Sequence, residues 1–231
     1  MKKIESSIIM STFNHEKSLP LAIKSILNQN YENFEFLILN DNSTDRTKKI
    51  LDNFKKKDPR IKVFNNSENL GLTKSLNVLI KESKGDFIFR QDSDDISLPN
   101  RLTKQVRLLR HPNNHACVTR AVNSFTLKKI PNISYYFPYK LVMHLKNPFV
   151  HGTLGIKKEV LYDVGLYDET FYYAQDYNLY KKLIMSKYRI IKVREIHYIL
   201  NMENNISSNF KEEQDEYASI VKSRNKNIEL K

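Results

Sequence analysis

The sequence predicts an α/β fold in which a mainly parallel central sheet is flanked by helices. Short apolar runs alternate with amphipathic segments through the first half of the chain, which is the pattern of a parallel sheet with helical crossovers. Polar residues follow directly after three of these runs, where the carboxyl ends of parallel strands bind ligands. Since 231 residues suffice for one sizeable core, we expect a single domain over residues 1–231.

In the first half, we expect strands at Ser7–Ser11, Phe34–Leu39, Ile61–Phe64 and Phe87–Phe89. Three helices are expected between them. Asn14 is expected to cap the first, whose apolar face is Leu19, Ile23, Ile26 and Leu27. Ser43-Thr44-Asp45 is expected to start the second, with Ile50, Leu51 and Phe54 inward. The third is expected from Leu72 to Lys84, with Gly85 as its C-terminal cap.

Pro99 is expected to open a helix in the second half, with Leu102, Val106 and Leu109 on its buried face. The basic row Arg101, Lys104, Arg107 and Arg110 on another face is interpreted as solvated, in preference to a specific anion site. Further along we expect an aromatic loop at Tyr135–Tyr139, strands at Val150–Ile156 and Tyr188–Val193, and helices at Tyr177–Met185 and Lys211–Arg224.

The composition limits the location and the partners. The formal charge is +12, spread through the chain, which indicates an anionic partner such as a membrane surface, a phosphorylated substrate or nucleic acid. The single cysteine, Cys117, excludes an intrachain disulfide and is expected in a buried strand. We find no leader-like N-terminus and no apolar stretch long enough to span a membrane. We therefore expect a cytoplasmic protein, with peripheral contact at the inner face of the membrane as one option.

The acidic run Asp92-Ser93-Asp94-Asp95 follows an apolar strand. Three carboxylates in four positions repel one another unless a cation neutralises them. Oxygen ligands suit a divalent cation that keeps open positions for the phosphates of a nucleotide. The alternative is a solvated acidic turn before Pro99. We favour the metal interpretation because the run lies at a strand end.

Asp41 and Phe13 follow two other strands. The carboxylate of Asp41 can accept a hydrogen bond from the ring N–H of a base such as uracil, or it can cap the helix that follows. Because Ser43 or Asp45 can also cap that helix, Asp41 is expected to be free for a base. Phe13 can stack on a base, although a single Phe is more often a core residue.

Two residues of the second half have open interpretations. Asp176 stands near the start of a predicted helix, where it is either an N-terminal cap or a general base that takes a proton from an acceptor hydroxyl. The residues alone do not separate these alternatives. His151, in His151-Gly152-Thr153, is either a substrate contact or a structural histidine. The motifs GxGxxG, GxxxxGK[ST] and GxSxG are absent, as is any metal-spaced pair of His or Cys.

Six segments in order resemble family 2 glycosyltransferases of the GT-A fold, over nearly the whole chain. They are Ser7–Asn14, Ala22–Gln29, Phe34–Asp45, Asn69–Leu72, Arg90–Leu102 and the pair Gly165–Asp168 and Ala174–Leu179. The segment around the acidic run is similar to that of bacterial members that build lipopolysaccharide and capsule. The resemblance implies a nucleotide-sugar half at residues 1–98 and an acceptor half at residues 99–231.

The resemblance also implies roles for individual residues. It implies Mn²⁺ or Mg²⁺ held by Asp94 with Asp92 in support, and Asp176 as the base of a one-step inverting transfer. A UDP-sugar donor would be bound by a group of residues in the first half: Ser11, Phe13, Asn14, Glu16, Asp41, Asn69, Arg90, Asp92 and Ser93. A glycan or lipid-linked glycan acceptor would lie near His151, Gly152, Thr153 and Gln175.

Three positions depart from the family pattern. Gln175 stands where a Glu usually precedes the base, and Leu200 and Met202 replace an Arg and a His. They motivate a first rival hypothesis, a sugar-nucleotide-binding module without catalysis. A second rival, suggested by the charge of +12, is a nucleic-acid-binding protein. It is disfavoured because the acidic run would repel phosphates unless a metal were bound.

Overall fold

The structure is a computed structural model that describes residues 3–201 and 211–226. Its strands, in chain order, are β1 (Ser6–Thr12), β2 (Phe34–Asn40), β3 (Ile61–Asn65), β4 (Phe87–Arg90), β5 (Ile96–Ser97), β6 (Ala116–Asn123), β7 (Lys129–Ile130), β8 (Gly155–Lys157) and β9 (Ile190–Leu200). Its α-helices are α1 (Leu19–Leu27), α2 (Thr47–Lys57), α3 (Leu72–Glu82), α4 (Arg101–Leu109), α5 (Tyr139–Val142), α6 (Lys158–Asp163), α7 (Gln175–Met185) and α9 (Lys211–Lys226).

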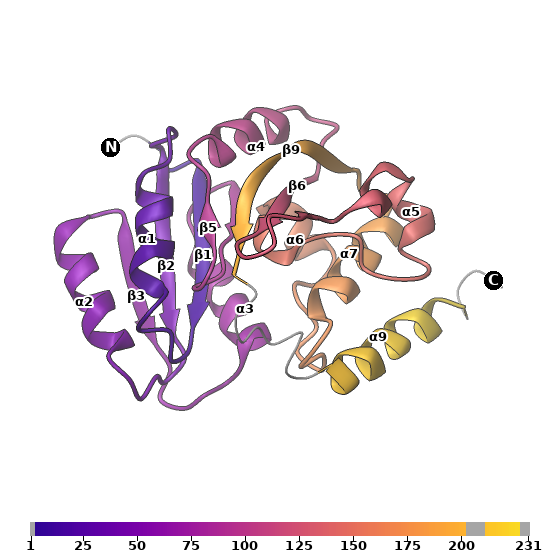
Figure 1. Cartoon of the computed structure of the whole chain (residues 1–231). Coiled ribbons are helices and arrows are strands. Elements are labelled where there is room, and N and C mark those ends of the chain that lie inside the picture. Colours follow the sequence, from indigo (N-terminus) through magenta and orange to yellow (C-terminus); the bar gives the residue numbers. More distant parts are fainter. Residues whose placement is uncertain (1–2, 202–210, 227–231) are drawn as a thin grey trace.

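The described strands form one sheet in the order β3-β2-β1-β4-β8-β6-β9-β5, and β7 pairs with β6 (Figure 1). The first four are parallel, as the sequence predicts. From β8 onward the sheet is mixed, because β8 is antiparallel to both β4 and β6 and β9 returns parallel to β6. The predicted α/β class is therefore confirmed, with an all-parallel part in the first half and mixed pairing in the second.

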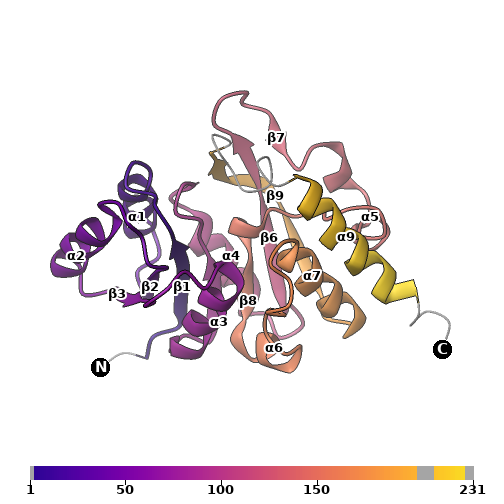
Figure 2. The same ribbon diagram turned by 90° about the horizontal axis from the view of Figure 1, so that it is seen from below.

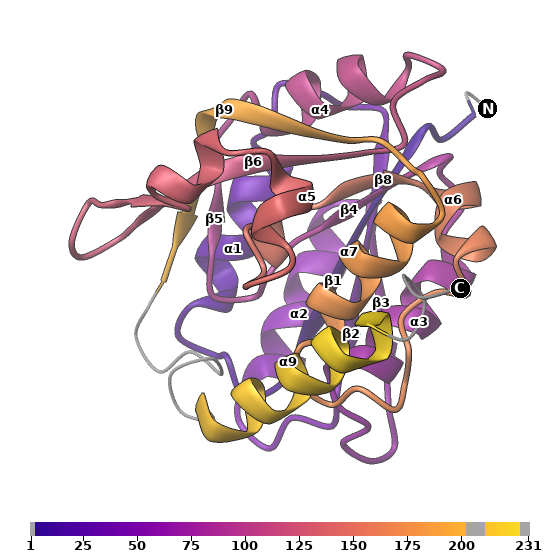
Figure 3. The same cartoon turned by 90° about the vertical axis from the view of Figure 1, so that its right-hand side faces the viewer.

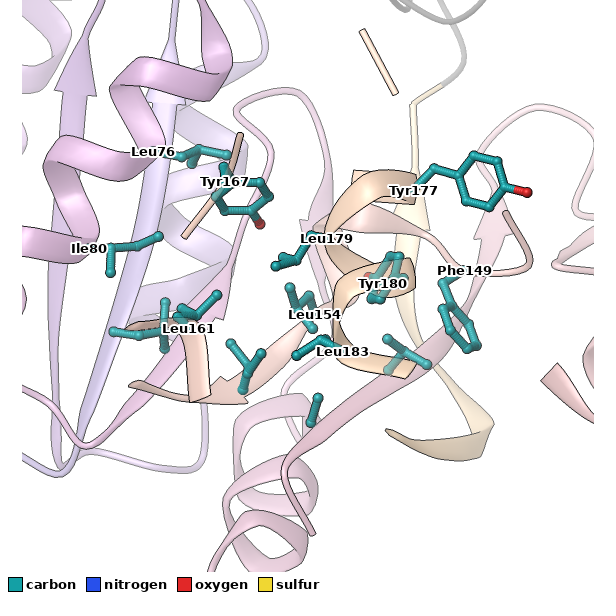
Figure 4. Close-up of a cluster of buried hydrophobic side chains, with 14 of the residues drawn as sticks. Leu76, Ile80, Phe149, Leu154, Leu161, Tyr167, Tyr177, Leu179, Tyr180 and Leu183 are labelled. Carbon is teal, nitrogen blue, oxygen red and sulfur yellow. The ribbon is translucent and has the colours of Figure 1, made fainter. Parts of the chain in front are cut away.

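Helices cover both faces of the sheet. Leu51 of α2 and Leu102 of α4 belong to a core cluster that also includes the buried face of α1. A second cluster lies on the other face, where α3, α6 and α7 meet the sheet (Figure 4). Tyr217 and Val221 of α9 pack against that second cluster, and α9 lies beside α7 (Figures 2 and 3). Burying large apolar side chains on both faces is the main stabilising contribution in such a fold.

Several predicted helix boundaries are wrong. Asn14 does not cap α1, which begins after Ser18; it has a left-handed φ of 55°. The second helix starts at Thr47, later than predicted, because Asp45 Oδ1 accepts a hydrogen bond from the Thr47 N–H and forms a turn before it. Gly85 is not a cap, since α3 ends at Glu82. A Cβ at Gly85 would lie 2.5 Å from the Ser6 carbonyl carbon, so a side chain there would collide with β1.

Predictions in the second half fail in three places. Arg101 is fully buried and donates to the side chains of Gln91, Ser97 and Gln105, so the basic row of α4 is not wholly solvated. The strand predicted at Val150–Ile156 begins with a 3₁₀ turn at His151–Thr153, and only β8 is extended. The predicted aromatic loop contains a 3₁₀ turn at Ile133–Tyr136 and the start of α5.

Two other expectations have mixed outcomes. Cys117 is buried in β6, as predicted. The strand predicted at Tyr188–Val193 begins at Ile190 and continues to Leu200, where it pairs with β5. Met202 lies outside the described residues. None of the described helices is long and apolar enough to cross a membrane.

Candidate active site

The acidic run begins two residues after β4, and the fold fixes it from several directions. The buried guanidinium of Arg90 donates a 2.5 Å hydrogen bond to Asp92 Oδ1. The Asp92 N–H donates to the hydroxyl of Tyr198 at 3.0 Å. At the other end of the run, Asp95 Oδ1 accepts a 2.8 Å bond from the Asn201 N–H. Strand β9 and the residue after it therefore hold the loop, although Tyr198 and Asn201 carry no local sequence signal that marks them.

The three carboxylates of the run differ in what they contact. Asp92 is paired with Arg90, and Asp95 is buried against β9. Asp94 is partly exposed and forms no ion pair with a described residue. Burial and the neighbouring charge of Asp92 raise the pKa of Asp94, so a cation at this carboxylate would relieve repulsion. Asp94 is thus the carboxylate best placed to bind a metal, with Asp92 second.

The carboxylates of the acidic run are the only charged groups of this loop that could hold the implied Mn²⁺ or Mg²⁺. Among the described residues, no cluster of three or more His, Cys, Asp or Glu side chains could enclose a metal ion. Mg²⁺ does not require such a cage, because it is often held by one or two carboxylates together with water and substrate phosphates. Asp94 and Asp92 supply two carboxylates on one loop. They fit an ion that completes its coordination with the donor diphosphate.

The turn at His151–Thr153 packs directly against this loop. A Cβ at Gly152 would lie 2.4 Å from the Tyr198 hydroxyl and 2.5 Å from Asp92 Oδ2, so only glycine fits there. His151 Nε2 is 2.7 Å from the Tyr167 hydroxyl, and burial, followed by the charge of Arg90, lowers the pKa of His151 to about 3. The Thr153 hydroxyl is fully buried and donates to the Val150 carbonyl. The acceptor contacts predicted for these three residues stay predictions, and the Thr153 side chain supports the turn.

Asp176 lies in the first turn of α7, one residue inside the helix. The N-terminal cap position belongs to Ala174, which has a left-handed φ of 52°. The helix-cap interpretation of Asp176 is therefore wrong. Its Oδ2 accepts a 2.7 Å hydrogen bond from Asn147 Nδ2, and its Oδ1 accepts one from the Tyr177 N–H. Asp176 keeps partial exposure, as a proton acceptor for a bound substrate requires.

Burial raises the pKa of Asp176 to about 6, and the charge of Asp92 is a further cause that acts in the same direction. The fold therefore brings Asp176 within electrostatic range of the acidic run, although Asp176 and Asp92 are 84 positions apart in the sequence. A carboxylate with a pKa near the working pH is suited to general base catalysis. Beside it, Gln175 is buried and its Oε1 has no hydrogen-bond partner within the described part of the chain.

Apart from Arg90 in β4 and Asp92 and Ser93 just after it, the predicted nucleotide-binding residues lie at the end of β1 or in the loops that follow β1, β2 and β3. Asp41 is buried and does not cap a helix, as expected, but it is not free. Its carboxylate accepts hydrogen bonds from Asn66 Nδ2 at 2.7 Å, the Leu70 N–H at 2.9 Å and the Gly71 N–H at 2.8 Å. Asn69 Oδ1 also accepts from the Gly71 N–H, at 3.2 Å. Asp41 thus organises the loop before α3, and a base contact stays a prediction.

The loop after β1 is tied to the neighbouring loop and to the acidic run. Asn14 Oδ1 accepts from the Thr44 N–H at 2.8 Å, and Glu16 Oε2 accepts from the Arg46 N–H at 2.9 Å. The Ser93 hydroxyl is hydrogen bonded to His15 Nδ1. Three predicted nucleotide-binding segments therefore form one connected rim. Phe13 is 43% exposed on it, and Ser11 is partly buried at the end of β1.

Surface hollows alone do not locate the site. A groove of about 600 Å³ lies at the start of β4, between residues such as Gly85, Arg110 and Lys158, which is the strand end opposite to Asp92. A second hollow of about 400 Å³, next to Glu16 and Arg46, borders the loops predicted to bind the nucleotide. The convergence of carboxylates at the other end of β4 is the stronger indicator, because perturbed acidic groups cluster at functional sites.

Known proteins carry the same pattern. The sequence profile described as glycosyl transferase family 2 matches residues 7–188. The chain belongs to this family. The family 2 chain is 36% identical to EpsE of Bacillus subtilis (strain 168) over 158 residues. This alignment covers 65% of the chain and 55% of EpsE. The chain is 32% identical over 184 residues to the O-antigen biosynthesis glycosyltransferase WbnJ of Escherichia coli, covering 77% of the chain and 71% of WbnJ.

Solved structures share the fold of this family 2 chain. Residues 1–349 of Staphylococcus aureus TarS in complex with UDP-GlcNAc superpose with a TM-score of 0.74 at 21% identity, over 87% of this chain and 59% of that one. The mannosyltransferase PcManGT of Pyrobaculum calidifontis, in complex with GDP-Man and Mn²⁺, gives 0.73 at 18% identity, over 91% and 60%. These glycosyltransferases confirm the predicted GT-A fold. The chain spans about half the length of EpsE.

Proposed function

We propose that this family 2 protein is an inverting, metal-dependent glycosyltransferase that moves a hexose or N-acetylhexosamine from a UDP-sugar to a hydroxyl group. The observation that carries the proposal is the placement of Asp176. It is a partly exposed carboxylate whose pKa is about 6, within electrostatic range of Asp92 on the loop that would bind metal and diphosphate. A base and a leaving-group site on opposite sides of one reacting carbon are what an inverting transfer needs.

In this proposal, Asp176 accepts the proton of the acceptor hydroxyl while that oxygen attacks the anomeric carbon. The bond from that carbon to the diphosphate oxygen breaks on the opposite face, so the configuration inverts. Asp94 and Asp92 would hold Mn²⁺ or Mg²⁺, which offsets the charge that builds on the leaving diphosphate. Asn147 orients the base through its hydrogen bond. Gln175 Oε1, which has no hydrogen-bond partner among the described residues, would accept a hydrogen bond from the acceptor sugar.

The uridine part of the proposal depends on Asp41 and Phe13. TarS was solved with UDP-GlcNAc and PcManGT with GDP-Man. One fold therefore accommodates either base, and the fold does not choose between them. We favour uridine because the segment Phe34–Asp45 resembles the family's second strand with its uracil-contacting aspartate, and Phe13 is exposed on the rim. WbnJ is an O-antigen biosynthesis enzyme, which supports a growing bacterial surface glycan, free or lipid-linked, as the acceptor.

A thermal-shift screen tests the donor. UDP-sugars are expected to raise the unfolding temperature in the presence of Mn²⁺ and much less in its absence. GDP-sugars, measured in parallel, serve as the matched control for the base. If no UDP-sugar changes the unfolding temperature with metal present, the donor proposal is wrong.

A transfer assay separates the enzyme from the binding module suggested by Gln175 and Leu200. The enzyme predicts release of UDP that depends on acceptor and is lost in Asp176→Asn while UDP binding remains. The binding module predicts UDP binding without turnover in the native protein. The nucleic-acid alternative predicts tight, salt-sensitive binding of oligonucleotides. Fluorescence anisotropy with a labelled oligonucleotide measures that binding on the same protein preparation.

A further inference from the structure

Large apolar side chains that reach solvent are concentrated in one short segment of the acceptor half. Ile133, Tyr136, Phe137, Leu141 and Leu145 have exposed fractions between 57% and 75%. Phe125 and Leu127, in the turn between β6 and β7 just before them, are exposed to a similar degree. Such a concentration in a folded protein indicates an interaction surface.

The segment is held in place, so this exposure is not a consequence of loose packing. Its Tyr135 is buried, and the Tyr135 hydroxyl donates a 2.8 Å hydrogen bond to the Val193 carbonyl of β9. Met143 is also buried, and its carbonyl accepts a 2.6 Å bond from the Tyr177 hydroxyl of α7. These anchors alternate with the exposed residues, so the fold presents the apolar side chains outward.

The charge of the same region is of one sign. No Asp or Glu occurs between Asp95 and Glu159. Lys128, Lys129, Lys140 and Lys146 are exposed among the apolar residues and form no ion pair with a described residue. Exposed lysines beside exposed aliphatic and aromatic side chains are the combination that binds an anionic lipid surface.

Other partners fit this combination less well. A nucleic acid or an acidic protein would pair with the lysines and leave the aliphatic side chains without a matching apolar contact. A second copy of the chain in a symmetric dimer would place lysines against lysines. A bilayer with anionic headgroups offers both a negative charge and an apolar layer just beneath it.

We propose that residues 125–146 form a surface that docks onto an anionic lipid bilayer. The segment leads directly to Asn147, which contacts the carboxylate of Asp176. Docking would therefore bring the acceptor side of the molecule to the membrane, a consequence that rests on the proposed function. Figure 1 shows α5 at the end of the molecule opposite to α2, so the donor loops beside α2 would remain turned toward the solvent.

Vesicle flotation tests the docking surface with the full chain. The native protein is expected to float with vesicles that contain phosphatidylglycerol and to remain behind with pure phosphatidylcholine vesicles. The pairs Leu141→Ser/Leu145→Ser and Lys140→Gln/Lys146→Gln are each expected to lower partitioning about tenfold or more. The matched controls are Leu21→Ser, which changes an exposed leucine of α1, and Lys55→Gln/Lys56→Gln, which removes the same charge from α2. Both controls should bind like the native protein.

Three results would overturn the proposal. They are no binding of the native protein to phosphatidylglycerol vesicles, equal losses in the segment and control variants, and a native dimer that Leu141→Ser/Leu145→Ser converts to a monomer in sedimentation velocity. The last result would assign the surface to a second copy. Because vesicle binding needs no sugar nucleotide, this proposal and the proposed donor can fail independently.

Discussion

Asn147 Nδ2 donates a 2.7 Å hydrogen bond to Oδ2 of Asp176, and this contact joins the segment after α5 to the first turn of α7. The orientation of Asn147 is fixed in turn, because its Oδ1 accepts a 3.0 Å bond from the Phe149 N–H. Burial raises the pKa of Asp176, and the Asn147 bond acts against that rise. Asn147 is therefore a positioning residue that keeps the proposed base both oriented and ionisable.

Replacing Asn147 by Ala is expected to shift the acidic limb of the pH profile of kcat/KM, which reports the free enzyme, to higher pH. In the native protein this limb should lie near pH 6, the pKa of Asp176. The hydrogen bond from Asn147 lowers that pKa, so its loss should raise the pKa and move the limb upward. The rate above the limb should fall about tenfold, as the carboxylate loses its orientation. Asn113→Ala, in an exposed loop, is the control. A lower rate with an unmoved limb would mean that Asn147 has only a structural role.

Replacing Asp176 by Asn is expected to reduce kcat by about 10²–10⁴, the usual contribution of a general base, with UDP binding retained. It should also change stability in a pH-dependent way. The pKa of Asp176 is raised in the folded state, so the folded protein binds more protons than the unfolded chain between about pH 4 and pH 6. The native protein should therefore lose stability relative to Asp176→Asn as pH rises through that window.

Melting curves of both proteins from pH 4 to pH 8 check the stability part. The difference in unfolding temperature between them cancels contributions from other groups. A difference that stays constant with pH would contradict the raised pKa. Full activity in Asp176→Asn would contradict the role as base.

Replacing Asp94 by Asn is expected to weaken the metal-dependent binding of a UDP-sugar by about tenfold or more, since a direct ligand should matter at least as much as its supporting groups. Stability without ligands should hold or rise slightly, because Asp94 and Asp92 repel each other in the absence of a cation. Calorimetric titration with Mn²⁺ present and absent measures the effect. The control Asp52→Asn changes an exposed residue of α2 and should bind the UDP-sugar like the native protein. If Asp94→Asn also bound the UDP-sugar as tightly as the native protein does, Asp94 would be excluded as a metal ligand.

Replacing Gly152 by Ala is expected to destabilise the fold by about 1–3 kcal/mol, the usual cost of overpacking. The new Cβ would meet both the Tyr198 hydroxyl and Asp92 Oδ2, so donor binding should weaken as well. Gly165→Ala is the comparison. Its φ is 76° and no atom of the described residues lies within 4 Å of a Cβ there, so it should show only the backbone cost of about 1 kcal/mol and leave donor binding intact. Urea denaturation measures the loss of stability, and calorimetry measures donor binding. Equal results for Gly152→Ala and Gly165→Ala would contradict the predicted collision at Gly152.

Local patterns predicted the first half of the fold well, because its strands and helices alternate and each buries a periodic apolar face. Periodicity failed where a residue has a tertiary partner. Arg101 looks like one of a basic row, but its guanidinium lies among the buried polar side chains of Gln91, Ser97 and Gln105. Gly85 looks like a helix cap, but it is required by the close approach of β1.

The candidate site could be predicted in part, again where the signal is local in the sequence. The acidic run and Asp176 are conspicuous in the sequence, and the family match extends across both. Tyr198, Asn201 and Asn147 were missed because each is hydrogen bonded to an aspartate more than 25 residues away, from β9, the residue after it, or the segment after α5. Such contacts leave no short-range pattern.

The sequence by itself determined the α/β class and the family. It also determined the two acidic sites on which the proposed chemistry depends, the run from Asp92 to Asp95 and Asp176. Those features are local, since they arise from side-chain periodicity and from clustered charge. Only the tertiary structure decided what each carboxylate does in the folded chain. It buried Asp95 against β9, paired Asp92 with Arg90, left Asp94 partly exposed and set Asp176 beside Asn147. Burial and pairing determine whether a carboxylate binds metal, takes a proton or supports a loop, and both depend on distant segments of the chain.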